Sequence, residues 1–295
     1  MIRTNNASFS EINLFHKIAD AVNYAEGKYC VVCADDDFIT PDGMKKSVDF
    51  LEKNPDFTIA HGYYITFCLK SSKKGKQHFC WTSCPPFKSI TFPEAESRLI
   101  FHLLNYHETF YAVHRTDLLK KIFKETIKYT NDNRFCELLP STLDLVYGKM
   151  KCLDVLYIAR EAIVNSTGQI SKDIVDFIKL GSYDKKYAKF RECLSIHLSK
   201  KSSLTMEESK KVVDKAMSNY LKENYGIRYR MDKLLKYLRL PDYIDTRMRK
   251  IYRKLCSLKQ VQTDNTKNLI DKPSSKYYDD FNKIRNHVLL YSKKQ

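Results

Sequence analysis

Patterns typical of helices and of strands alternate along the first quarter of the chain, and this alternation constrains the fold more than any other feature. A helix is predicted over residues 11–26, closed by Gly27. Residues 29–34 form an apolar run with the length and β-branched content of a buried strand. A second helix is expected over 41–53 and a second strand over 57–64. Alternating units of this kind predict an α/β fold with a largely parallel sheet.

Weaker patterns continue the series. Residues 70–90 read as a loop that contains the only tryptophan, Trp81, and from about residue 171 the pattern is helical and polar. The other elements expected from periodicity and turn residues are helices at 93–105, 117–128 and 136–148, and strands at 110–114 and 153–158.

Charge divides the chain into two unlike halves. The net charge is +16; residues 1–150 hold 19 Lys and Arg against 18 Asp and Glu, whereas residues 151–295 hold 32 against 17. A basic half of this kind attracts polyanions such as nucleic acid, anionic lipid headgroups or acidic glycans. Nine scattered cysteines, with no apparent signal peptide and no apolar stretch long enough to span a membrane, predict a cytoplasmic location.

Three consecutive carboxylates, Asp35, Asp36 and Asp37, follow the first predicted strand. Ligands commonly bind at the carboxyl ends of strands in α/β sheets. Adjacent like charges need compensation, and a divalent cation such as Mg²⁺ or Mn²⁺ prefers carboxylate oxygen. The alternative is that Asp37 or Asp42 caps the following helix, but capping uses one aspartate and leaves two without a role.

The order of motifs resembles a known family. The motif around the aspartates reads ADDDF, and a later segment reads FYAVHRT. Together with further motifs, they resemble family 2 glycosyltransferases of the GT-A fold, in particular a bacterial subgroup that has both segments. The segments that carry the resemblance are Ala21–Tyr29, Ala34–Phe38, Leu51–Pro55, Phe110–Thr116, Arg134–Pro140 and Tyr147–Lys149. The similarity covers about residues 11–165.

The resemblance implies an α/β fold: a partial GT-A (Rossmann-like) mixed sheet with helices, followed by a helical C-terminal extension. Members of the family begin with nucleotide-binding strands, and this chain has few residues before its first predicted helix. We therefore expect an N-terminally truncated GT-A-like domain over 1–165 with an exposed sheet edge. A basic helical domain is expected over 166–257 and a polar helical or flexible tail over 258–295.

The implied activity is metal-dependent, inverting transfer of a sugar from a nucleotide-diphosphate sugar to a glycan or lipid-linked hydroxyl acceptor, in surface polysaccharide synthesis. Asp35 and Asp37 have the D-x-D spacing of a metal site, whereas comparison with relatives favours Asp36 as the metal ligand, with Asp35 near the ribose. All three stay candidates. Glu137 resembles the catalytic base; its alternative is a first-turn glutamate favoured by the helix dipole.

Other candidates for catalysis or substrate contact lie at strand ends, except Glu108, which stands beside His107. Glu108 is a second candidate base, and His114 and Arg115 end a short strand where they would reach phosphate or acceptor. A structural histidine and a surface arginine are equally good interpretations of that pair. His61 ends another strand, and Gly62 beside it would permit close approach of a neighbouring backbone.

The basic tail has two interpretations. Arg228–Arg230 and Arg247–Lys254 combine basic and apolar residues in a helical rhythm, which suits peripheral contact with the anionic inner face of a membrane. The alternative is a solvated lysine-rich bundle. Two other functions were weighed for the whole chain: a nucleic-acid-binding protein, for which no recognition motif is evident and no specific nucleic acid is expected, and an inactive remnant of a glycosyltransferase.

Overall fold

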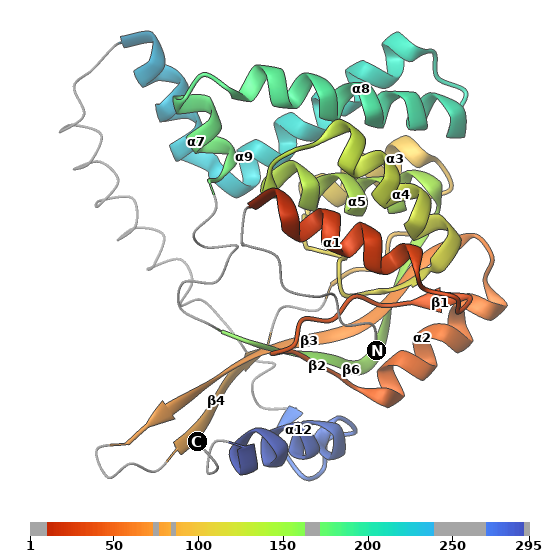
Figure 1. Cartoon of the computed structure of the whole chain (residues 1–295), viewed down its shortest axis with the longest axis vertical. Helices are drawn as coiled ribbons and strands as arrows, with labels where there is room; N and C mark the ends of the chain where they lie inside the picture. Colours follow the sequence, from red (N-terminus) through yellow and green to blue (C-terminus); the bar gives the residue numbers. More distant parts are fainter. Residues whose placement is uncertain (1–10, 73–76, 84–86, 163–171, 239–269, 292–295) are drawn as a thin grey trace.

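The structure is a computed structural model that describes residues 11–72, 77–83, 87–162, 172–238 and 270–291. Within these ranges, the side chains of residues 11–13, 83, 227–238 and 291 are not described. The fold is mixed α/β, as expected: helices surround a curled sheet, and further helices follow it (Figure 1).

The sheet has the strand order β1-β5-β3-β6-β2, with β4 paired to β3 off this path. Its strands are β1 Tyr29–Cys30, β2 Phe38–Ile39, β3 Phe57–Ser71, β4 Gln77–Ser83, β5 Val113–Arg115 and β6 Lys149–Glu161. Among these strands only β3 and β6 run parallel; the other pairs are antiparallel. The expectation of a largely parallel sheet is therefore wrong, because β2, β4 and β5 run antiparallel to the long strands β3 and β6, and β1 runs antiparallel to β5.

The predicted buried strand at 29–34 is also only partly present. Pairing ends at Cys30, and residues 31–34 run on without a ladder partner among the described residues. Their side chains are half-buried or, at Cys33, exposed. β1 is an edge strand whose one neighbour among the described strands is β5, so its backbone lacks a partner on the other side. The prediction of a buried strand at 29–34 is therefore wrong.

The helices lie close to their predicted positions. They are α1 Glu11–Asn23, α2 Pro41–Lys53, α3 Ala95–Leu104, α4 Thr116–Tyr129, α5 Asn133–Tyr147, α7 Ile174–Lys179, α8 Tyr183–Lys201, α9 Met206–Leu238 and α12 Tyr278–Tyr291. Local signals explain their limits. Thr40 caps α2 by accepting a hydrogen bond from the Gly43 amide, with Pro41 in the first turn, and Asp132 caps α5 through two amides.

The segment predicted as a loop at 70–90 contains most of a β-hairpin. β3 extends to Ser71, and β4 pairs with it from Gln77 onward. Trp81 of β4 lies opposite Phe67 of β3 and packs its ring against Phe281 of α12, with 5.0 Å between the ring centroids. The loop prediction failed because the strand partner of β4 is the extension of β3, which the local sequence pattern does not indicate.

Helices cover both faces of the sheet (Figure 1). α2 and α12 lie on one side, and α1, α3, α4 and α5 lie on the other. The helices α7, α8 and α9 do not form a separate layer with a core of their own, because their apolar residues share one buried cluster with those of α3 and α5. The predicted boundary at 165/166 falls in residues 163–171, outside the described residues.

Gly62 confirms the close approach expected at the His61–Gly62 pair. A Cβ atom at Gly62 would lie 2.3 Å from the carbonyl oxygen of Val155 and 3.0 Å from Cβ of Tyr157, both on the neighbouring strand β6. The register between β3 and β6 shifts at this place. Only glycine leaves room for β6 here, so the residue is required by packing.

Candidate functional site

The aspartate triplet lies in the turn between β1 and β2. Asp35 is exposed, Asp36 is half-buried, and the side chain of Asp37 is 4% exposed. None of the three caps a helix: Thr40 caps α2, and Asp42 pairs with Lys46 on its surface. The capping interpretation is therefore wrong, and the triplet needs another explanation.

Asp37 is held by the protein on both sides of its carboxylate. Oδ1 accepts a hydrogen bond of 3.0 Å from the Glu161 amide, and Oδ2 lies 3.7 Å from Nε of Arg160. The nearby Tyr111 hydroxyl also favours the charged form of this carboxylate. Burial raises the pKa of Asp37 although these partners favour its charged form. Asp37 thus ties the turn to the end of β6.

Asp36 is the aspartate that combines partial burial with freedom to bind. No hydrogen bond or ion pair joins Asp36 to another described residue, whereas its charge acts on Glu161 at the end of β6. Burial, followed by repulsion from Asp36 and Asp37, raises the pKa of Glu161. These carboxylates lie close enough to repel one another electrostatically, and their hard oxygen donors fit Mg²⁺ or Mn²⁺.

Arg160 links the aspartates to the segment before β5. Its guanidinium forms an ion pair with Glu108 and lies over the ring of Tyr111, 4.7 Å from the centroid. With the contact to Asp37, Arg160 thus lies between two carboxylates that are far apart in the sequence. Its side chain is 33% exposed, so the guanidinium also faces solvent and remains able to contact an anion.

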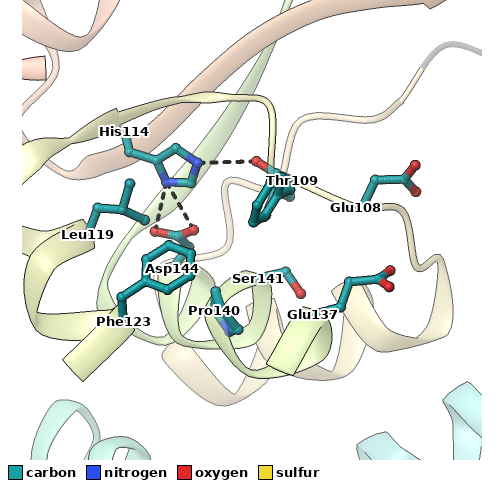
Figure 2. A pocket seen from close by; sticks show the side chains of 10 residues that line it. Glu108, Thr109, His114, Leu119, Phe123, Glu137, Pro140, Ser141 and Asp144 are labelled. Carbon is teal, nitrogen blue, oxygen red and sulfur yellow. Dashed lines mark hydrogen bonds and ion pairs between the residues drawn. The ribbon is translucent and has the colours of Figure 1, made fainter. Parts of the chain in front are cut away.

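Glu137 lies in the second turn of α5, beside the same group. Its Oε1 accepts a hydrogen bond of 3.2 Å from the Tyr106 hydroxyl, and its Oε2 lies 3.3 Å from Nη1 of Arg134. Burial raises the pKa of Glu137, Arg134 lowers it, and the charge of Glu108 raises it further. The carboxylates of Glu108 and Glu137 lie on the same side of the pocket, away from His114 (Figure 2). A carboxylate of raised pKa that is still 30% exposed suits proton transfer.

Deeper in this pocket lies a buried pair, His114 of β5 and Asp144 of α5 (Figure 2). Nδ1 of His114 lies 3.2 Å from Oδ2 of Asp144, and Nε2 faces the Thr109 carbonyl at 3.2 Å. The cavity among these side chains has a volume of about 10 Å³, space for roughly one water molecule. His114 therefore joins β5 to α5, and its predicted contact with substrate stays a prediction.

Arg115 and His61 have structural partners. The Arg115 guanidinium donates to the carbonyls of Phe57, Leu51 and Asn54, which ties the end of α2 to the sheet. His61 is fully buried in β3, with Nδ1 2.9 Å from the Gly62 carbonyl. Neither side chain meets the group around Arg160, so the structure does not bring these two candidates together with the others.

His61 belongs to a buried group of three histidines. His107 lies between His61 and His102, with ring centroids 5.7 Å apart in each pair, and stacks on Phe87 at 3.9 Å. Both ring nitrogens of His102 and Nε2 of the other two have no hydrogen-bond partner. Burial lowers the pKa of all three, that of His61 to about 3. The group is neutral when folded.

We expect these histidines to make the fold sensitive to acid. Below pH about 6.5 the unfolded chain takes up protons at these residues and the folded chain does not, so the free energy of unfolding falls as the pH falls from about 6.5 towards about 3. Each histidine contributes a slope of up to about 1.4 kcal/mol per pH unit. In denaturant unfolding of the full chain, His102→Phe should reduce this loss. The exposed His16→Gln should leave it unchanged, and equal slopes in both variants would contradict the explanation.

Several residues of this site were missed by the sequence analysis. Arg160 and Glu161 lie just beyond the predicted strand 153–158, and a charged pair at the carboxyl end of a strand was a usable signal. Tyr106 had no such signal, because its role depends on its contact with Glu137 and on the ring of Tyr220 from α9, whose centroid lies 5.1 Å away.

No protein-family model and no curated protein matches this chain. Among the described residues, no helix has the length and apolar character needed to cross a membrane. The basic segment Arg247–Lys254 and the side chains of Arg228–Arg230 lie outside what the structure describes, so the predicted membrane contact stays a prediction.

Proposed function

We propose that the chain is a metal-dependent glycosyltransferase that moves a sugar from a nucleotide-diphosphate sugar to a hydroxyl acceptor. One observation carries the proposal. Asp37, Glu108 and Glu137 come from three distant segments: Asp37 and Glu108 both pair with Arg160 at the end of β6, and Glu137 lines the same pocket as Glu108. The sequence resemblance implies site roles for Asp37 and Glu137, and Glu108 is the second candidate base.

The residues divide into two ends of one site. Asp36 and Glu161 would hold the cation, and their charges lie close enough to repel each other. Asp37 is less suited to this role, because both of its carboxylate oxygens already contact protein groups. When bound, the ion would neutralise the diphosphate and stabilise the negative charge that develops on the leaving group. Arg160, held in place by Asp37 and Glu108, adds a fixed positive charge beside it.

Glu137 supplies the proton acceptor at the other end. As the acceptor hydroxyl attacks the anomeric carbon, the proton of that hydroxyl passes to the Glu137 carboxylate. Contacts with Tyr106 and Arg134 set the orientation of this carboxylate. Burial, which raises the pKa of Glu137, makes it a stronger base than an exposed glutamate. The implied partners are a nucleotide-diphosphate sugar and a glycan or lipid-linked acceptor.

The proposal is tested by calorimetric titration of the full chain with UDP, GDP and dTDP in the presence of Mn²⁺. We expect one of these nucleotides to bind only with the metal, and Asp36→Ala to abolish that binding. Asp42→Ala is the matched control, because Asp42 is also an aspartate near the turn but pairs with Lys46 on the surface of α2.

Metal-independent binding, or unchanged binding by Asp36→Ala, would contradict the assignment. The nucleic-acid alternative predicts a different result: steeply salt-dependent retention of DNA or RNA that survives Asp36→Ala. Measuring both ligands on the same variant therefore separates the two functions.

A further inference from the structure

A second group of metal-ligating side chains lies away from the proposed sugar site, between α4 and α8. Glu125 comes from α4, and Cys193 and His197 come from α8. Each offers one ligand atom, and these atoms all lie within 4.8 Å of one another. It is the one group of three such residues that meets this distance in the described part of the chain.

Helix geometry creates the arrangement. Cys193 and His197 are four residues apart, so both side chains leave α8 on the same face. That face packs on α4, where Oε2 of Glu125 lies 3.6 Å from Nε2 of His197. Donor atoms around one zinc ion are about 3 to 4 Å apart, as follows from Zn–S near 2.3 Å and Zn–N near 2.0 Å.

The surroundings orient the histidine for ligation. Nδ1 of His197 lies 2.7 Å from the hydroxyl of Tyr147, the last residue of α5. A histidine that donates its Nδ1 proton to Tyr147 presents the Nε2 lone pair to Glu125 and Cys193. Metal-bound histidines are commonly held in this way through the other ring nitrogen.

Burial and charge agree with a single ion at this place. Cys193 is fully buried and His197 nearly so, whereas the side chain of Glu125 is 24% exposed and offers a path from solvent. The charged groups nearby are Lys121 and Lys128 on α4 and Glu192 and Lys200 on α8. A thiolate and a carboxylate together balance the two charges of a divalent ion, although the lysines oppose it.

We propose that Glu125, Cys193 and His197 bind Zn²⁺, with water as the fourth ligand. Sulfur and imidazole donors select zinc rather than Mg²⁺ or Mn²⁺, so this site differs in kind from the carboxylate site at Asp36. The ion would join α8 to α4, and thereby the C-terminal helices to the helices that cover the sheet. Because zinc binds the thiolate form of cysteine, binding would release a proton from the Cys193 thiol to solvent.

The experiment uses Co²⁺ as a spectroscopic probe on the metal-free full chain. We expect one equivalent of Co²⁺ to give a thiolate-to-cobalt charge-transfer band in the near ultraviolet, and Zn²⁺ to displace it. Cys193→Ala should lose the band, and Cys136→Ala should keep it, because Cys136 is equally buried but contacts Thr130 instead of ligands. Tyr147→Phe should weaken the affinity by about 10- to 100-fold.

Two further measurements keep the result interpretable. Asp36→Ala should retain the charge-transfer band, because a carboxylate ligand cannot produce it. Failure of the sugar-site proposal is therefore distinguishable from failure of the zinc-site proposal. If Cys193→Ala does not fold, X-ray absorption at the zinc edge of the wild-type chain still decides, since it must show a sulfur neighbour at about 2.3 Å. Absence of that sulfur, or a cobalt band that persists in Cys193→Ala, would overturn the proposal.

Discussion

Replacing Glu137 by glutamine should reduce sugar transfer by about 10²- to 10⁴-fold, the usual contribution of a positioned base. The amide keeps the shape of the side chain and its contact with Tyr106, but it cannot accept the proton of the acceptor hydroxyl. Nucleoside diphosphate binding should be unchanged, because that binding is assigned to the other end of the site. Calorimetry identifies which nucleoside diphosphate binds, and the corresponding sugar nucleotide is then used as the donor. The rate is measured as the release of that nucleoside diphosphate.

Glu108→Gln is the matched control for this prediction. It removes a second carboxylate from the same pocket, and Glu108 forms its ion pair with Arg160. We expect a smaller loss of turnover, with weaker binding of the diphosphate because Arg160 is less well held. A reversed order, with the larger loss of turnover in Glu108→Gln, would transfer the role of base to Glu108.

The pH profile gives an independent check on Glu137. Because burial raises its pKa, the acidic limb of the turnover profile should lie above the range of an exposed glutamate, with activity lost as the pH falls through that limb. Arg134→Ala removes the charge that lowers this pKa, so the limb should move to still higher pH. An unmoved limb would show that another group controls it.

Replacing His114 by alanine should lower the free energy of unfolding by about 3 to 5 kcal/mol, the usual cost of leaving a buried carboxylate without its partner. The side chain of Asp144 is 1% exposed, and His114 supplies its side-chain contact among the described residues. Without the imidazole, the carboxylate remains buried between β5 and α5 with no partner. Denaturant unfolding of the full chain measures the loss.

His78→Ala is the comparison for that variant, since His78 is an exposed histidine on β4. It should change stability by less than about 0.5 kcal/mol, as surface substitutions usually do. A similarly small change in His114→Ala would contradict the structural role of the pair. It would also leave open the contact with phosphate or acceptor that the sequence resemblance implies for His114.

Much of the local structure was predictable from the sequence. α2 has its predicted limits because Thr40, Pro41 and Asn54 lie within a few residues of its ends, and such signals act locally. Gly62 was expected to permit a close backbone approach, and it does. The pairing of strands was not predictable in the same way: β4 lay inside an expected loop, and the antiparallel β1, β2 and β5 replaced an expected parallel sheet.

The candidate site shows the same division. The sequence indicated Asp35, Asp36 and Asp37 as a cluster that needs compensation, and pointed to Glu137 through its resemblance. It did not indicate Arg160, which lies between Asp37 and Glu108, nor that His61 and Arg115 would be engaged by the core and by the end of α2.

The sequence by itself thus determined the mixed α/β class, the positions of most helices and the acidic turn after the first strand. These depend on periodicity and on caps, which are interactions between residues a few positions apart. Only the tertiary structure decided which carboxylates share Arg160, which aspartate keeps its oxygens free of protein partners, and that Glu125 meets Cys193 and His197. Those contacts join residues far apart in the chain, and their geometry depends on how strands and helices pack rather than on any local pattern.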